Sequence, residues 1–410
     1  MFTSLKFAIL FIVFILIDKL STAQQVSKPF PQHVKYAGGV IKPNHVSQQQ
    51  LDDSVRSFYE NWKERYVHDD AGPGQYYIWV EGTVDKNECV SEGQGYGMII
   101  TALMAGYDPD AQKIYNGLYQ YYHAHPSKRN PYLMAWAQTK TFHDIDGSSA
   151  TDGDMDIAYS LLLADAQWGS HGSINYLDEA KAIIQAITEQ EINHETFSVL
   201  LSNAVEPESE DYYDTRSSDF MPAHFKIFGK ATKDNFWNKV VDENYMLFAF
   251  MQKQYSPDAG LVPDFIEHVN RNPDAARPHY LESKYDGAYN YNACRVPWRV
   301  ATDFIINGDK RSKEFVEKIN KWIRETTENN PDNISAGYTL QGNDIKNRDY
   351  EAMSFIASFA VAAMIDESNQ AWLNKLWDYV LSFNTDKFEY YGNTIKMISM
   401  IILSGNYWTP

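Results

Sequence analysis

Helical periodicity is the feature that most constrains the fold of this 410-residue chain. Apolar residues recur at three- and four-residue spacing in eleven segments, as in LLLADAQW and FVEKINKWI. Convincing alternating runs, which would predict strands, are few, and the best of them is YYIWVEG. The predicted helices cover residues 48–66, 95–105, 111–123, 155–167, 176–190, 235–254, 297–306, 312–327, 350–364, 370–383 and 394–403.

Helices of ordinary length, joined by loops rich in Gly, Pro, Asn and Asp, predict an all-α fold. No break in composition divides residues 48–410, so we expect one domain there. Periodicity alone does not choose between an open solenoid and a closed ring of helix pairs. A closed ring would place its chemistry on loops at one end, and these loops hold the densest clusters of Asp, Glu, Tyr and Trp.

The N-terminus reads as an export signal. Lys6 precedes an apolar run over residues 7–17, and small residues follow at Ser21-Thr22-Ala23. This order predicts a secretory signal peptide over residues 1–23 and a secreted protein. The alternative, a permanent anchor, is weaker because the run is about half of the roughly 20 residues that span a membrane. Residues 24–47 are polar and contain several prolines, so we expect a leader strap over the surface.

The formal net charge of −18 constrains the partners. Nucleic acid is not expected, because phosphate binding requires a basic surface. An acidic chain is compatible with a neutral polysaccharide and mildly favours a cationic one such as chitosan, although acidity also simply keeps an exported protein soluble. No later stretch is apolar enough to span a bilayer, so we expect no membrane partner after signal removal. We expect a monomer.

The first chemically informative segment is CVSEGQGYGM, residues 89–98. Three glycines within five residues beside Glu92 allow the backbone to approach another group closely before a helix begins. The bland interpretation is that Glu92 complements the dipole of that helix. The functional interpretation is a catalytic carboxyl group.

The second segment, SATDGDMDIAY, places three aspartates at alternate positions, Asp152, Asp154 and Asp156. A calcium loop is not favoured, because the twelve-residue pattern with a terminal glutamate is missing. Asp154 is the candidate for the cap of the following helix. The remaining carboxylates are then free to face a cleft.

The third segment is YNYNACRVPWR, residues 289–299. Polar aromatic residues beside an arginine suit sugars, whose apolar faces stack on rings while their hydroxyls form hydrogen bonds. Tyr291 and Arg295 are therefore candidate substrate-binding residues. The alternative is a core aromatic cluster in which Arg295 pairs with a buried acid.

Two cysteines in an exported protein form one disulfide or remain two buried thiols. Cys89 and Cys294 each lie beside one of these segments and approach each other if the segments converge. Both outcomes stay open, because a disulfide depends on geometry that sequence does not supply.

Six segments follow one another along the chain: SEGQGYGM, NPYLMAWAQ, ATDGDMDIAYSLLLADAQWGS, SSDFMPAHFKIF, YNYNACRVPWRVATDF and YYGNTIKMISMIILSGNYW. Together they resemble glycoside hydrolase family 8 from about residue 75 to the C-terminus. The resemblance implies an (α/α)6 barrel and hydrolysis of cellulose, mixed-linkage glucan, xylan or chitosan with inversion at the anomeric carbon.

The resemblance also implies roles for individual residues. Glu92 matches the general acid of the family, and Asp152 matches the residue that binds and distorts the sugar at the cleavage point. Trp136 resembles a stacking platform. Tyr291 and Arg295 flank the position at which many members carry a general-base aspartate.

This chain has Asn292 at that position, and an amide cannot accept a proton from water. The departure resembles the branch of chitosanases and lichenases, in which a glutamate from a nearby loop replaces the aspartate. Glu282 is the candidate base and Asp286 is the reserve, and we expect Asn292 and Asp286 otherwise to bind substrate.

The resulting prediction is an inverting endo-β-1,4-glycanase with two carboxyl groups about 6.5 to 9.5 Å apart. The scheme requires no cofactor and no metal. Two alternatives remain open: a xylan-cleaving member of the same family, and a carbohydrate-binding protein that has lost the base.

Overall fold

The computed structural model describes residues 26–345 and 352–410, so the predicted signal peptide lies outside the described residues. Within these ranges the chain forms twelve α-helices and four short 3-10 helices. The α-helices are α1 (Gln48–Tyr66), α2 (Ser91–Met104), α3 (Ala111–Ala124), α4 (Thr151–Trp168), α5 (Tyr176–Gln190), α6 (Pro222–Thr232), α7 (Phe236–Gln254), α8 (Val296–Asn307), α9 (Lys310–Thr326), α10 (Met353–Ala363), α11 (Gln370–Leu381) and α12 (Tyr390–Leu403). The 3-10 helices are η1 (Ser217–Asp219), η2 (Ala293–Arg295), η3 (Pro331–Asn333) and η4 (Glu367–Asn369).

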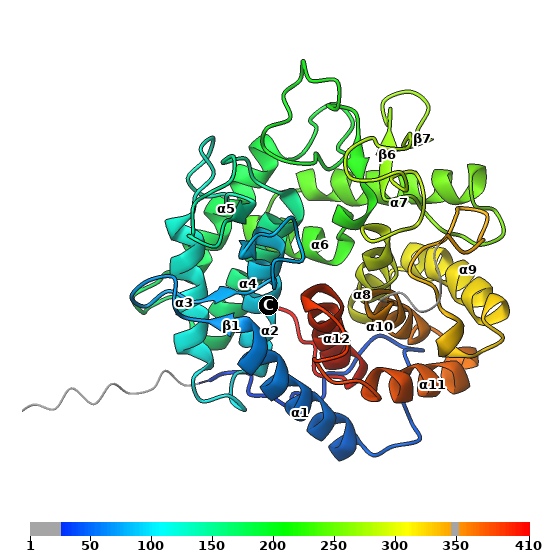
Figure 1. Ribbon diagram of the computed structural model, residues 1–410, viewed down its shortest axis with the longest axis horizontal. Helices are drawn as coiled ribbons and strands as arrows, with labels where there is room; N and C mark the ends of the chain where they lie inside the picture. The colour runs from blue at the N-terminus through cyan, green and yellow to red at the C-terminus, as the bar shows by residue number, and fades with distance from the viewer. Residues whose placement is uncertain (1–25, 346–351) are drawn as a thin grey trace, which may run out of the picture.

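The helices form two concentric rings (Figure 1). The even-numbered helices α2 to α12 surround the centre, and the odd-numbered helices α1 to α11 lie outside them. The inner ring closes because α12 packs against both α10 and α2, and α1 packs on the outside of α12. The all-α prediction and the (α/α)6 barrel implied by the resemblance are confirmed.

Burial follows this arrangement. Every residue of the inner helix α10 is buried, which requires an apolar sequence all round the helix. The outer helix α9 buries one stripe only, which includes Phe315, Ile319 and Ile323, and leaves its charged residues in solvent. The hydrophobic pattern of a helix therefore indicates whether it lies in the inner or the outer ring.

The inner helices begin at one end of the barrel. Glu92 in the first turn of α2 contacts both Tyr390, the first residue of α12, and Arg295, which directly precedes α8. Arg295 also reaches Asp152 in the first turn of α4. The N-terminal turns of the inner helices thus converge on a common centre.

The segment that precedes α1 lies at the other end. The N–H groups of Phe30, Val34 and Ala37 donate to the carbonyls of Ala105, Gly405 and Ile305, at 2.7 to 2.9 Å. These carbonyls lie at or just beyond the C-terminal ends of α2, α12 and α8. The segment therefore supplies donors to carbonyls that a helix end leaves without an intrahelical partner.

The strands are short and lie in the loops. Strand β2 (Tyr77–Ile78) pairs antiparallel with β1 (Val67–His68), and β3 (Cys89–Val90) pairs with β4 (Ala137–Gln138). The third sheet has the order β5 (Thr215–Arg216), β6 (Phe265–Glu267) and β7 (Asp274–Ala275). The predicted strand YYIWVEG is wrong in extent, since only Tyr77 and Ile78 pair.

Two further differences concern the helices. Helix α6 was not predicted, although Pro222 occupies its first turn and Phe225 and Phe228 are buried. Helices α2, α4 and α12 begin four residues earlier than predicted, which brings Glu92, Asp152 and Tyr390 into their first turns. No helix of residues 26–345 and 352–410 is long and apolar enough to cross a membrane.

Candidate active site

Glu92 lies where the inner helices converge, and its side chain is only 17% exposed. Its Oε2 accepts a hydrogen bond from Arg295 Nη1 at 2.7 Å, and its Oε1 accepts one from the Tyr390 hydroxyl at 3.2 Å. Burial raises the pKa of Glu92 to about 7, against the opposing charge of Arg295 and with help from the charge of Asp152. Glu92 is thus a carboxylic acid that holds its proton near neutral pH.

Arg295 links the acidic residues. Its guanidinium is buried, and Nη1 also donates to Asp152 Oδ2 at 2.6 Å. Nη2 donates to Ser218 Oγ at 2.8 Å and to Asn292 Oδ1 at 3.0 Å. These contacts match the alternative in which Arg295 pairs with a buried acid. Substrate binding by Arg295 stays a prediction.

Asp152 differs from Glu92 in its protonation. Burial alone would raise the pKa of Asp152, but the guanidinium groups of Arg295 and Arg216 outweigh it and lower the pKa below its ordinary value. Two carboxyl groups on one arginine therefore favour opposite states, one ionised and one protonated. Such a separation is typical of paired catalytic acids.

Close contact between α2 and α4 brings these two carboxyl groups together. A Cβ at Gly153 would lie 2.3 Å from Ser91 Oγ, and a Cβ at Gly95 would lie 2.7 Å from the Cβ of Asp156. Glycine is required at both positions, since real Cβ atoms do not approach so closely. The glycines beside Glu92 and Asp152 thus set the spacing of the site.

Glu282 approaches the same centre from the loop between β7 and η2. Asn292 Nδ2 donates to its Oε2 at 2.7 Å, and Arg216 Nη2 donates to its Oε1 at 3.3 Å. The side chain is 47% exposed, so water reaches it. Because Asn292 also accepts a hydrogen bond from Arg295, one amide connects Glu282 to the arginine that holds Glu92.

Asp286 lies beneath the loop that carries Glu282. It is buried, and its carboxylate accepts the backbone N–H groups of Leu281, Glu282 and Ser283 at 2.7 to 2.9 Å. In the structure Asp286 therefore shapes the loop that carries Glu282. Its reserve role as base or substrate ligand stays a prediction.

Trp136 and Tyr291 border this centre. The Trp136 carbonyl accepts from the N–H of Ser91, so its backbone lies beside the start of α2, and its Nε1 donates to Asp146 Oδ2 at 3.1 Å. The Tyr291 carbonyl accepts from the Tyr391 hydroxyl at 2.6 Å, and both tyrosines are partly buried. The structure brings both predicted residues to the end of the barrel that holds Glu92.

The three alternating aspartates have separate partners. Asp154 does not cap α4, because it accepts the Met134 N–H at 2.8 Å and hydrogen-bonds to Glu191. Burial raises the pKa of Asp154 well above its ordinary value and the pKa of Glu191 to about 7. Asp156 forms a bidentate ion pair with Arg299. In the described ranges no group of three or more His, Cys, Asp or Glu side chains is arranged to hold a metal ion.

Both cysteines are buried free thiols. Cys294 Sγ lies 3.0 Å from the Tyr291 carbonyl, and Cys89 Sγ lies 3.6 Å from Gln94 Oε1. The segments converge as expected, but the two thiols have different neighbours.

Sequence reasoning missed four residues of the site, Arg216, Ser218, Asp219 and Tyr390. The guanidinium of Arg216 lies 3.9 Å from the carboxylate of Asp152 and 3.7 Å from that of Asp219. Asp219 is buried and follows Ser218, whose hydroxyl accepts a hydrogen bond from Arg295. Tyr390 contacts Glu92. Ser218, Asp219 and Tyr390 belong to segments that carry the family resemblance, so that resemblance was the available signal; Arg216 directly precedes one of these segments.

Comparison with known proteins agrees with this geometry. The family description "Glycosyl hydrolases family 8" matches residues 29–405. A protein from Niallia circulans named beta-glucanase is 44% identical, covering 97% of this chain and 95% of its own length. An endoglucanase from Bacillus sp. (strain KSM-330) is 40% identical and covers 96% and 84%.

Solved structures show the same fold. The apo structure of a β-1,3-1,4-glucanase from Paenibacillus sp. X4 has a TM-score of 0.90 at 44% identity, covering 94% of this chain and all of the other. Rex8A from Paenibacillus barcinonensis complexed with xylose has a TM-score of 0.76 at 17% identity, covering 91% and 98%, a likeness of fold. With a family match over nearly the whole described chain, this protein belongs to the glycosyl hydrolases of family 8 and is a glycoside hydrolase.

Proposed function

We propose that the chain is an inverting endo-β-glucanase in which Glu92 is the general acid and Glu282 the general base. One observation carries the proposal: Arg295 contacts Glu92, Asp152 and Asn292, and Asn292 holds Glu282. A protonated carboxyl group and a water-accessible carboxylate therefore belong to one hydrogen-bonded network. Inverting hydrolysis requires this pair of groups.

In the proposed reaction, Glu92 donates its proton to the glycosidic oxygen as the bond to the anomeric carbon breaks. A water molecule attacks the opposite face of the sugar and gives a proton to Glu282. Arg216 and Asn292 are hydrogen-bond donors, and they match a carboxylate, which only accepts. Asp152 remains ionised beside the sugar, where it hydrogen-bonds to a hydroxyl group as the ring distorts.

The proposed substrate is a β-glucan with β-1,4 linkages, either mixed-linkage glucan or cellulose. The support is the 44% identity to proteins named beta-glucanase and β-1,3-1,4-glucanase. The proteins named for xylose release are under 25% identical, so they support the fold and not a xylan substrate. Chitosan remains the alternative that the acidic charge of the chain favours.

The test is a panel of lichenan, carboxymethyl cellulose, chitosan and xylan, with new reducing ends as the readout. We expect the highest rate on lichenan. Early proton NMR should show the α-anomer first, because inversion of a β-linkage gives that product. Initial β-anomer, or binding without new reducing ends, would contradict the mechanism.

Export as a monomer is part of the proposal. The prediction of export rests on the order of basic, apolar and small residues in the segment 1–23. Mass spectrometry of protein recovered from the medium should find a mature chain that begins near residue 24, and light scattering should give the mass of one chain. A cell-associated protein with an intact N-terminus would contradict the secretion signal.

A further inference from the structure

The guanidinium of Arg295 has an acceptor in the protein on every side. Nη1 donates to Glu92 and Asp152. Nη2 donates to Ser218 Oγ at 2.8 Å and to Asn292 Oδ1 at 3.0 Å, and Nε donates to the Asn292 carbonyl at 3.4 Å. A guanidinium carries its five N–H groups in one fixed plane, so these acceptors set its orientation. Ser218 is the acceptor that the proposed reaction does not use.

The Ser218 hydroxyl connects Arg295 to Asp219. Because an arginine only donates, Ser218 Oγ accepts from Arg295, and its own proton is left for another acceptor. That acceptor is Asp219 Oδ1, at 3.1 Å. Ser218 and Asp219 are both 0% exposed, so neither side chain contacts a sugar in the cleft. The order of donors and acceptors therefore runs from Arg295 through Ser218 to Asp219.

The other oxygen of Asp219 faces the arginine beside the proposed base. Oδ2 lies 3.7 Å from Arg216 Nη1, which is beyond hydrogen-bond length, and it has no hydrogen-bond partner within the described residues. Arg216 in turn donates to Glu282 at 3.3 Å. Asp219 thus has two contacts of different kinds, a hydrogen bond from Ser218 and an ion pair with Arg216.

The neighbouring serine holds the backbone of this turn. The N–H of Ser217 donates to the Asp264 carbonyl at 3.0 Å, and its hydroxyl donates to the Pro263 carbonyl at 2.6 Å. Both contacts tie η1 to the segment before β6, and no hydrogen bond of the Ser217 side chain reaches an arginine. Two adjacent buried serines therefore differ in their partners, since only the Ser218 hydroxyl contacts Arg295.

Asp219 accepts from Ser218 in either protonation state. Burial raises the pKa of Asp219 to about 7, against the charge of Arg216 and with help from the charge of Asp152. A protonated carboxyl group keeps one oxygen that accepts, so Ser218 retains its partner on both sides of that pH. Ser218 therefore requires the acceptor oxygen of Asp219 and not its charge.

We propose that Ser218 and Asp219 form a positioning pair for the catalytic acid. Asp219 fixes the Ser218 hydroxyl as an acceptor, and Ser218 fixes the plane of the Arg295 guanidinium against Glu92. The inference rests on the proposed function, because it gives the pair a part in proton transfer from Glu92. Since neither residue touches the substrate, the pair acts on the rate of bond cleavage and not on binding.

The first test compares the two adjacent serines. Ser218→Ala removes an acceptor of Arg295, whereas Ser217→Ala removes a buried hydroxyl that contacts only the Pro263 carbonyl. Ser218→Ala should lower kcat on lichenan by about tenfold, within the roughly 10² that a misplacement of about 1 Å costs. KM should stay close to the wild-type value. Ser217→Ala should lower the melting temperature and leave kcat unchanged.

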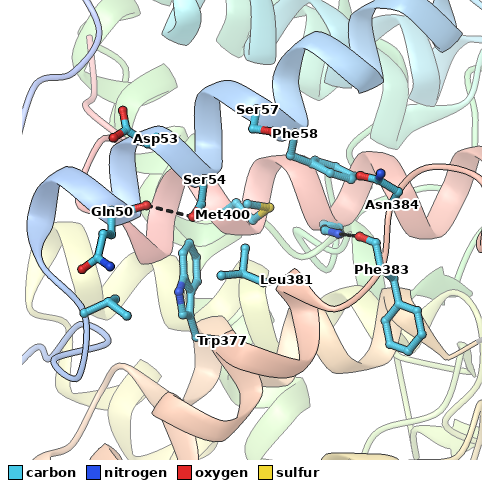
Figure 2. Close-up of a pocket in the computed structure, with 12 residues that line it drawn as sticks. Gln50, Asp53, Ser54, Ser57, Phe58, Trp377, Leu381, Phe383, Asn384 and Met400 are labelled. Carbon is cyan, nitrogen blue, oxygen red and sulfur yellow. Dashed lines mark hydrogen bonds between the residues drawn. The ribbon is translucent and has the colours of Figure 1, made fainter.

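Ser54→Ala is the control for loss of a hydroxyl far from the site. Ser54 lies in α1, in the wall of a groove of about 500 Å³ between α1 and α11, and donates to the Gln50 carbonyl in the same helix (Figure 2). The lining of this groove includes none of the residues that contact Glu92 or Arg295. Both kcat and the pH profile of Ser54→Ala should match those of the wild type.

The pH profile of kcat/KM separates positioning from stability. Burial raises the pKa of Glu92; the charges of Arg295 and Arg299 oppose this shift, and the charge of Asp152 adds to it. In Ser218→Ala a loosened Arg295 opposes the shift less, so Glu92 holds its proton to higher pH and the alkaline limb moves upward. A merely structural role of Ser218 would lower the melting temperature and leave this limb in place.

A second pair of variants tests the acceptor on Asp219, and it decides the question if Ser218→Ala does not fold. Asp219→Asn keeps an oxygen that accepts from Ser218, whereas Asp219→Leu removes it at similar volume. We expect kcat of Asp219→Asn close to the wild-type value and kcat of Asp219→Leu as low as that of Ser218→Ala. Equal losses in the two Asp219 variants would show that the charge facing Arg216 matters instead, and would overturn the positioning pair.

The same kcat and the same alkaline limb in Ser218→Ala and Ser217→Ala, in an enzyme that hydrolyses lichenan, would also overturn the positioning pair. Failure of the wild type to hydrolyse any glycan of the panel would instead overturn the proposed function. The two failures are therefore distinguishable, because the first is measured on an active wild-type enzyme.

Discussion

Asn292 Nδ2 lies 2.7 Å from Glu282 Oε2, so the amide that stands at the family's usual base position holds the carboxylate to which we assign that role. The other end of the amide accepts a hydrogen bond from Arg295 at 3.0 Å. A single side chain thus joins the loop acid to the arginine beneath Glu92. The proposed base therefore lies one hydrogen bond away from Asn292.

We predict that Glu282→Ala lowers kcat by about 10² to 10⁴, the usual contribution of a general base. Azide should restore part of the activity, because a small anionic nucleophile needs no base, and the product should be an α-glycosyl azide. Mass spectrometry and NMR of the products on lichenan check both statements. Full activity of Glu282→Ala would remove Glu282 from the role.

Asp286→Ala is the matched variant for the loop. It removes the acceptor of three backbone N–H groups and should lower activity by displacing Glu282. Azide should rescue Asp286→Ala less than Glu282→Ala, since Asp286→Ala keeps the Glu282 carboxylate and only displaces it.

Asn292→Asp in the Glu282→Ala background should regain a measurable fraction of the activity, because it restores a carboxylate next to the same water.

Glu92→Gln should lower kcat on lichenan by about 10² to 10⁴ while leaving the melting temperature close to that of the wild type. The pH profile gives a second readout. Because the pKa of Glu92 is raised to about 7 and the acid must be protonated, wild-type activity should fall as the pH rises through that value. Glu92→Gln should lack this alkaline limb. A rate within threefold of the wild type would exclude Glu92 as the acid.

The fold could be predicted where apolar residues recur with helical spacing along the sequence. Helices 48–66 and 176–190 were correct to the residue, because amphipathic stripes and flanking turns define outer helices. The inner helices α2 and α4 were predicted too short at their N-termini. Their first turns contain Gly93 and Gly153, which weaken a helix signal and are present because neighbouring backbones approach there.

The site was only partly predictable. Glu92 and Asp152 could be proposed as site residues because each lies in a segment that carries the family resemblance. Arg216 could not, since its role depends on Asp152 and Glu282, which are distant from it in the sequence. The same is true of Asp286, whose three backbone donors are a matter of loop conformation. Pairings between distant residues require tertiary structure.

Gly153→Ala should perturb the site through packing. Its Cβ would lie 2.3 Å from Ser91 Oγ and 2.6 Å from the Ser91 backbone, so α4 must move away from α2. Overpacking of this kind costs about 1 to 3 kcal/mol, and a shift of about 1 Å between Glu92 and Asp152 lowers kcat by as much as about 10².

Gly38→Ala is the control for this change, since nothing lies within 4 Å of its Cβ and its φ is not in the left-handed region. Thermal unfolding and kcat on lichenan should both be unchanged in Gly38→Ala. If Gly153→Ala retains wild-type kcat, close contact of α2 and α4 does not set the spacing of the acids.

Removing one charge from the ion pair between Asp156 and Arg299 should strongly lower the free energy of unfolding. Both side chains are buried, with contacts at 2.7 and 2.6 Å, and His224 adds a third contact at 3.0 Å. Asp156→Asn keeps the volume but leaves the Arg299 charge buried without its anion, which costs about 3 to 5 kcal/mol of unfolding free energy. Urea denaturation at pH 6 measures it.

Asp242→Asn is the matched control, because the Asp242–Arg311 pair is exposed and contributes less than about 1 kcal/mol to the free energy of unfolding.

The pH dependence of unfolding shows whether the charge of Asp156 causes the difference in stability between wild type and Asp156→Asn. Burial would raise the pKa of Asp156, but Arg299 and His224 outweigh it and lower the pKa to about 2. The stabilisation is therefore complete above pH 3.8 and disappears as the pH falls toward 2, so the gap between wild type and Asp156→Asn should stay constant from pH 5 to 7 and narrow below pH 4. A gap that is the same at pH 3 as at pH 6 would show that packing, and not the charge of Asp156, stabilises this layer of the barrel.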